Sequence, residues 1–155
     1  MQYICPLVVV TDLPRSREFY ESVLEVRVKF DFGANITFEG DFSLQTIDSW
    51  AQFIEQDQGA IRLGARNGEL YFETEDIEAF AQKLAQRADI RYVHGLKEHR
   101  WGQRVVRFYD PDGNIIEVGE DMCGLCRRFF AQGWSVEEIC AHTMLPPDFV
   151  KNCRA

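Results

Sequence analysis

Apolar and polar residues alternate in short runs along the first part of the chain, with the period of two residues that is typical of β-strands. Three such runs cover residues 26–32, 35–39 and 42–46. Before them, residues 3–10 are rich in β-branched side chains, and the apolar residues of 14–24 recur at helical spacing. The pattern therefore predicts a strand, a helix and then three more strands.

The same order of elements returns in the second part of the chain. Asp76 lies 64 residues after Asp12, and each aspartate stands where it can cap the helix that follows. The succession β-α-β-β-β therefore occurs twice, which is the signature of a duplicated module. The second set of predicted elements comprises strands at 69–76, 90–96, 103–109 and 114–118 and a helix at 77–86.

Polar residues occupy equivalent positions in the two repeats. The shift of 64 residues places Cys5 on Glu69, and aligning the last strand of each repeat places Gln45 on Glu117. Glu117 stands between Ile116 and Val118, where an apolar side chain would be expected. If the repeats pair about a pseudo-twofold axis, period-two alternation can aim all four side chains into one cavity. We therefore expect Glu117 to face a site rather than the core.

Three segments carry a resemblance to a known superfamily: VVVTDLPRSREFYESVL, ELYFETEDIEAFAQKL and WGQRVVRFYDPDGNIIEVGE. They resemble the vicinal oxygen chelate superfamily, which includes glyoxalase I, bleomycin-resistance proteins and extradiol dioxygenases. The resemblance implies an α+β fold, in which two βαβββ modules (residues 1–56 and 69–120) form a cupped eight-stranded mixed sheet. The domain would then span 1–120, followed by a helical extension at 121–155. It also implies a homodimer.

In metal-using members of that superfamily, the ligands come from the first and last strands of each module. Those positions hold Cys5, Gln45, Glu69 and Glu117 here, and only Glu117 is of the usual ligand type. Carboxylates suit Mg²⁺ or Mn²⁺, whereas a thiolate favours Zn²⁺. We expect no cofactor; the alternative is a divalent metal bound by both glutamates. Without a cation, two facing carboxylates would repel, and Glu117 could then act as an acid or base. A neighbouring arginine (Arg104 or Arg107) or a backbone donor could instead satisfy Glu69.

Aromatic residues make up 13% of the chain and crowd the predicted strands. Many must form the core, but the remainder would line a concave sheet face suited to a planar or aromatic ligand. The function predicted is that of a small-molecule binding protein of the glyoxalase/bleomycin-resistance type. The alternative is a metal-dependent lyase, isomerase or dioxygenase, with His94 or His99 as a further candidate base. The predicted ligand-binding residues are Phe42, Trp50, Tyr71, Trp101, Arg107 and Tyr109.

The net charge and the number of cysteines indicate which partners and which cellular compartment to expect. A net charge of -8 argues against binding nucleic acid or an anionic membrane. The N-terminal residues lack the basic region and cleavage site of a signal peptide, so we expect a cytoplasmic protein. Five cysteines, an odd number, favour free thiols in a reducing compartment. The CxxC pair Cys123 and Cys126, with Cys140 and His142, offers a weaker zinc or redox interpretation.

From Met122 onward the pattern predicts two or three short helices, broken at Gly133 and at Pro146-Pro147. Ser135 and Glu138 have the spacing of a capping box. A helix-turn-helix interpretation would need a basic recognition helix, which this segment lacks. We expect an appendage that packs on the domain or on a second subunit.

Overall fold

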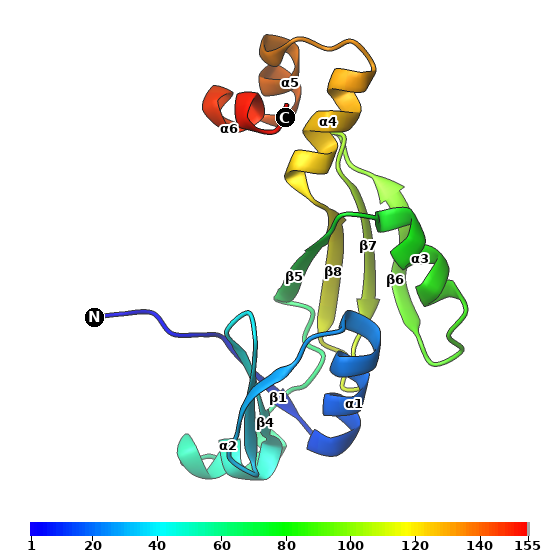
Figure 1. Cartoon of the computed structure of the whole chain (residues 1–155). Coiled ribbons are helices and arrows are strands. Elements are labelled where there is room, and N and C mark those ends of the chain that lie inside the picture. Colours follow the sequence, from blue (N-terminus) through cyan, green and yellow to red (C-terminus); the bar gives the residue numbers. More distant parts are fainter. Residues whose placement is uncertain (155) are drawn as a thin grey trace. The chain divides into compact units, whose positions relative to one another are not determined.

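The structure is a computed structural model of the whole chain, and residues 1–154 are described. The chain forms two compact units (Figure 1). The first contains residues 1–69 together with 109–115, and the second contains residues 70–108 together with 116 onward. In the described part of the chain, no helix has the length and apolar character needed to cross a membrane.

The first unit contains one βαβββ module. Its sheet has the strand order β1-β4-β3-β2, in which β1 runs parallel to β4 and the other neighbours are antiparallel. Val9 lies across from Gln45 in this register. The elements are β1 (Leu7–Val10), α1 (Leu13–Leu24), β2 (Val28–Asp31), β3 (Asn35–Phe38) and β4 (Phe42–Thr46).

Two differences from the predicted elements have local causes. The first strand begins at Leu7 rather than at Tyr3, because Leu7 pairs with Ser43 near the start of β4 and the earlier residues have little strand beside them. Two short helices after β4 were not predicted, α2 (Ile47–Phe53) and the 3₁₀-helix η1 (Gln58–Ala60). Thr46 caps α2 by accepting a hydrogen bond from the Ser49 amide at 3.4 Å.

The core of the first unit is aromatic and includes residues from far along the chain. The ring of Tyr20 on α1 lies 5.7 Å from that of Phe38 and 5.6 Å from that of Phe42. The Tyr20 hydroxyl donates to Asp110 Oδ2 at 3.0 Å. Burial, followed by the Asp110 carboxylate, raises the pKa of Tyr20 well above its ordinary value, so the hydroxyl stays protonated as a donor. The DPDGN turn therefore completes the first unit.

The second unit contains the other βαβββ module. Its four-stranded sheet has the order β5-β8-β7-β6, the equivalent of the first sheet. Asp76 caps α3 through the Ala79 amide at 2.9 Å, just as Asp12 caps α1 through the Arg15 amide at 3.0 Å. The elements are β5 (Glu69–Thr74, whose first residue groups with the first unit), α3 (Ile77–Ala85), β6 (Arg91–Glu98), β7 (Arg104–Tyr109) and β8 (Ile115–Glu120).

The α+β class and the duplicated βαβββ order are thus confirmed. The structure gives two four-stranded sheets. Their closure into one cupped eight-stranded sheet stays a prediction, as do the domain limits drawn from the sequence.

The C-terminal extension consists of α4 (Met122–Ala131), α5 (Val136–Thr143) and α6 (Pro147–Asn152), with breaks at Gly133 and Pro146 as predicted. The capping box of Ser135 and Glu138 is present. The three helices share a hydrophobic cluster of their own, which comprises Leu125, Cys126, Phe129, Ile139, Val150 and Cys153.

The expectation that all the cysteines are free thiols was wrong for two of them. Cys123 and Cys153 form a disulfide, with their Cα atoms 4.9 Å apart and a sequence separation of 30. Cys126 is fully buried in the cluster, so the two cysteines of the CxxC pair do not bond to each other. Burial raises the pKa of the Cys126 thiol, which keeps it protonated and a poor nucleophile. Packing of α4 against α6 creates the disulfide, and sequence spacing does not reveal that packing.

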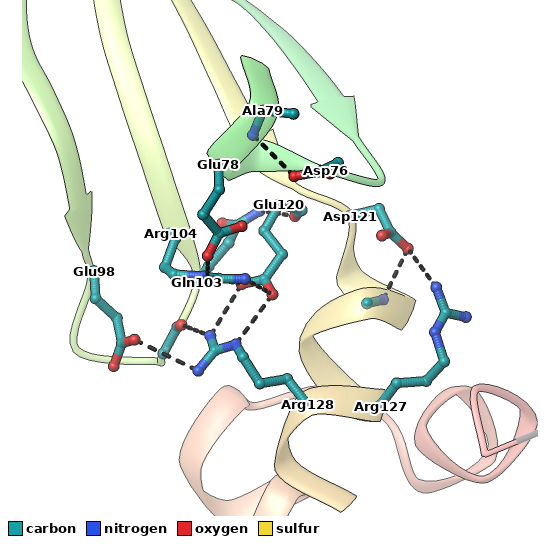
Figure 2. A network of polar contacts seen from close by, with 12 residues as sticks. Asp76, Glu78, Ala79, Glu98, Gln103, Arg104, Glu120, Asp121, Arg127 and Arg128 are labelled. Carbon is teal, nitrogen blue, oxygen red and sulfur yellow. Dashed lines mark hydrogen bonds and ion pairs between the residues drawn. The ribbon is translucent and has the colours of Figure 1, made fainter. Parts of the chain in front are cut away.

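Glu120, the last residue of β8, joins the extension to the second sheet (Figure 2). Arg128 of α4 contacts both of its carboxylate oxygens, at 3.1 and 2.9 Å, and Arg104 of β7 contacts them at 2.6 and 3.2 Å. Arg104 also pairs with Glu78 on α3. Burial acts to raise the pKa of Glu120, but the hydrogen bonds from Arg128 and Arg104 outweigh it, so the pKa lies below its ordinary value.

A lowered pKa in the folded state makes Glu120 a source of acid sensitivity. Its contribution to the free energy of unfolding is complete above the unfolded-state pKa of about 4.3. That contribution is lost as the pH falls through the lower folded-state pKa. We expect the free energy of unfolding of Glu120→Gln to fall less steeply than that of the wild type between about pH 5 and pH 2. Urea melts across this range measure the slope, with the exposed Glu75→Gln as control. Equal slopes for wild type and Glu120→Gln would contradict the assignment.

Candidate functional site

One face of the second sheet is covered by α3, and we call the opposite side the open face. The ring of Phe80 on α3 lies 6.3 Å from that of Phe108 on β7, which marks the covered face. Ile116 and Val118 are buried in the core, so alternation along β8 directs Glu117 to the open face. Glu117 is nevertheless only 5% exposed. A carboxylate buried to this degree needs a cation or several donors.

The cation is Arg107 of β7, whose guanidinium Nη2 pairs with Glu117 Oε2. The turn between β7 and β8 explains why they meet. The Asp110 amide donates to the Asn114 carbonyl at 2.9 Å, and counting outward along the hairpin from that pair places Arg107 across from Glu117. The mid-strand carboxylate is therefore matched by a mid-strand arginine.

Two imidazoles lie against the same guanidinium. Arg107 Nη1 is 3.3 Å from His94 Nε2 and 3.1 Å from His99 Nε2. A guanidinium can only donate, so the Nε2 atom of each imidazole is the acceptor in these contacts. In agreement, His94 Nδ1 lies 2.8 Å from the Gly95 carbonyl oxygen, an acceptor. Arg107 therefore binds one carboxylate and contacts two imidazoles at once.

Aromatic side chains extend this cluster along the open face. The Trp101 ring stacks on His99 with centroids 4.3 Å apart, and its Nε1 donates to Gln103 Oε1 at 3.2 Å. Gln103 Nε2 donates to the Tyr71 hydroxyl at 2.7 Å, and that hydroxyl donates to Glu73 at 2.7 Å. Partial burial, followed by the Glu73 hydrogen bond, raises the pKa of Tyr71 to about 12, so it is not a base at neutral pH. Tyr71 is 48% exposed and Trp101 38%.

The structure thus brings Tyr71, Trp101, Arg107 and Glu117 of the predicted site together in the second unit. Gln103, which links the two aromatic residues, was missed. Gln103 lies an even number of residues before Arg107, so period-two alternation places both side chains on the same face of the sheet. This spacing could have identified Gln103 from the sequence.

The first unit holds two of the other predicted site residues on the corresponding face of its own sheet. Cys5 Sγ lies 3.4 Å from Ser43 Oγ. Gln45 is 2% exposed; its Nε2 donates to Ser49 Oγ at 2.9 Å, and its Oε1 accepts from Asn35 at 3.4 Å. Neutral partners satisfy this amide within the unit.

The remaining predicted residues have separate positions. Phe42 is 4% exposed and stacks on Phe38 at 4.8 Å, so it forms the core of the first unit rather than a ligand-facing wall. Trp50 is half-buried on α2, and the Arg66 guanidinium lies 5.7 Å from the Tyr109 ring centroid. Glu69 is exposed at the start of β5. Convergence of Cys5, Gln45, Glu69 and Glu117 on one cavity involves both units and stays a prediction.

The donors of the second unit do not fit a divalent metal. Glu117 is already neutralised by Arg107, and the lone pairs of both imidazoles accept from the same guanidinium. A cation placed among them would face a fixed positive charge within a few ångströms. Within residues 1–154, no group of three or more His, Cys, Asp or Glu side chains could hold a metal ion.

The sequence profile of the glyoxalase-like domain matches residues 3–123, which include both βαβββ modules. The chain belongs to the glyoxalase-like domain family. The match ends at the beginning of α4, so nearly all of the helical extension lies outside it. The comparison with curated proteins gives no match.

Three solved structures are similar in fold to this chain. A protein of unknown function from Agrobacterium tumefaciens str. C58 is 38% identical, with a TM-score of 0.71, and the match covers 79% of this chain and 95% of that one. A glyoxalase/bleomycin resistance protein/dioxygenase from Nocardioides is 20% identical (TM-score 0.62; 77% and 83% covered). Lactoylglutathione lyase from Agrobacterium tumefaciens is 23% identical (TM-score 0.58; 78% and 95% covered). The last two support the fold alone.

Proposed function

We propose that this glyoxalase-like protein binds a planar aromatic small molecule on the open face of its second sheet, without a metal. The observation that carries the proposal is the pair of exposed aromatic residues Tyr71 and Trp101 beside the partly buried Arg107–Glu117 ion pair. Apolar surface with a few fixed polar groups is the usual composition of small-molecule sites. Tyr71 and Trp101 would stack on the ligand, and the oriented polar groups would select its substituents.

Two tyrosines of similar exposure on opposite faces of the sheet make a matched test. Tyr71 is 48% exposed on the open face, whereas Tyr92 is 40% exposed and lines a groove with α3 on the covered face. The probes are bleomycin, indole, naphthol and quinoline, titrated by calorimetry. We expect at least one to bind, with Tyr71→Ala weakening it by about tenfold or more and Tyr92→Ala leaving it unchanged. Absence of binding by all four, or equal losses in both variants, would contradict the proposal.

A separate measurement tests the proposal that no metal takes part. Protein purified without chelators or added metals is expected to contain well under one equivalent of any divalent ion by elemental analysis. The reason is the guanidinium that already neutralises Glu117. Stoichiometric metal that disappears in Glu117→Ala would instead support the metal-dependent lyase, isomerase or dioxygenase.

A homodimer in the cytoplasm completes the proposal. The superfamily resemblance supports the homodimer, and the N-terminal residues, which lack the features of a signal peptide, support the cytoplasm. Gel filtration at micromolar concentration that gives a monomer would remove the dimer.

A further inference from the structure

The loop between β6 and β7, residues 99–103, carries three side chains of the cluster on the open face, His99, Trp101 and Gln103. Two backbone hydrogen bonds close it: the His99 amide donates to the Gln103 carbonyl at 2.8 Å, and the Gly102 amide donates to the His99 carbonyl at 2.9 Å. Because these side chains come from one short turn, the position of the turn determines where they lie relative to Arg107.

Arg128 of α4 holds this loop from the side of the helical extension. Its Nη2 donates to the Gly102 carbonyl at 2.5 Å, and its Nη1 lies 3.5 Å from Glu98 Oε2 at the end of β6. The same guanidinium is anchored on the buried Glu120 at the end of β8 (Figure 2). The planar guanidinium has several donors in a fixed arrangement, so Arg128 can bind Glu98, Gly102 and Glu120 at once.

Phe129, the next residue of α4, packs on the same loop. Gly102 has φ of +88°, and a Cβ at this position would overlap the Phe129 ring. Phe129 is itself held by stacking on Trp134, with centroids 4.6 Å apart, and by the edge of His142 at 5.5 Å. The extension therefore contacts the loop in two ways, through the hydrogen bond from Arg128 and through the packing of the Phe129 ring.

We propose that the helical extension positions the ligand-binding loop of the second module, with Arg128 and Phe129 as the positioning residues. The extension thereby sets the places of Trp101 and His99 without touching the ligand. The proposal rests on the proposed function only for its effect on ligand affinity. A purely structural extension would add stability to the chain and leave the loop unchanged.

The neighbouring arginine provides the control for the experiment. Arg127 is half exposed and contacts only Asp121, at 3.8 Å, among the ion pairs described. Arg128→Gln and Arg127→Gln are compared by the NMR signal of the Trp101 indole N–H, which reports its bond to Gln103 and is assigned with Trp101→Phe. We expect Arg128→Gln to shift or broaden this signal and to weaken the best aromatic probe by about fivefold to tenfold, whereas Arg127→Gln changes neither. Arg128→Lys should fall between wild type and Arg128→Gln, and it carries the test if Arg128→Gln does not fold.

The outcomes separate the two proposals. If no probe binds the wild type, the proposed function fails, while a moved Trp101 signal in Arg128→Gln still supports positioning. If Arg128→Gln loses thermal stability but keeps the Trp101 signal of the wild type, the extension is structural only and the inference is overturned. A moved signal with unchanged probe affinity also overturns it, because the loop would then not serve the site.

Discussion

Arg107→Met is expected to lower the free energy of unfolding by about 3 kcal/mol. Removing one partner of a buried ion pair leaves the other charge uncompensated, a loss of roughly 3–5 kcal/mol in proteins. We expect the lower end of that range, because the Arg107 side chain is 21% exposed and water can partly replace it. Met preserves the length and packing of the arginine stem. Urea denaturation of the purified variant gives the value.

The double variant separates an unpaired charge from lost packing. Arg107→Met with Glu117→Gln removes both charges, so we expect it to recover at least half of the loss measured for Arg107→Met alone. Glu117→Gln alone leaves a cation that reaches water and should cost less than Arg107→Met. A loss below about 1 kcal/mol for Arg107→Met would place the pair among solvent-screened surface ion pairs.

The second large effect concerns the extension. Cys153→Ser opens a ring closed across 30 residues of sequence, and we expect the extension to lose roughly 3–4 kcal/mol of stability from the greater freedom of the unfolded chain. Urea melts of the wild type should then shift on adding a reductant, whereas those of Cys153→Ser should not. Cys5→Ser, in the other unit, is the control. Wild-type melts that do not respond to reductant would show that the two thiols are not joined in solution.

The sequence was sufficient to predict the duplicated fold, because its signals are local. Alternation of two residues marked the strands, and Asp12 and Asp76 each mark the start of a helix. α2 was missed because a helix of seven residues with a single buried residue, Ala51, has almost no periodicity to detect.

The candidate site was predictable in part for the same reason. Glu117 stood out in an apolar strand, and its partner Arg107 could have been found by counting outward from the DPDGN turn. The contacts of His99 and Arg128 could not be found in this way. They depend on a five-residue loop and on the packing of α4 against it. Neither feature produces a periodic pattern of apolar residues in the sequence.

The DPDGN turn also determines when the first unit can be completed while the chain is being synthesised. Asp110 follows Tyr20 by 90 residues, and Asp112 follows Thr11 by 101, yet both aspartates bond to the start and middle of the first module. While the ribosome is still making the second module, the Tyr20 hydroxyl lacks the acceptor that its burial requires. The first unit therefore cannot be completed until most of the second module has been synthesised, and a cut at the boundary between the repeats would separate it from a part of its own core.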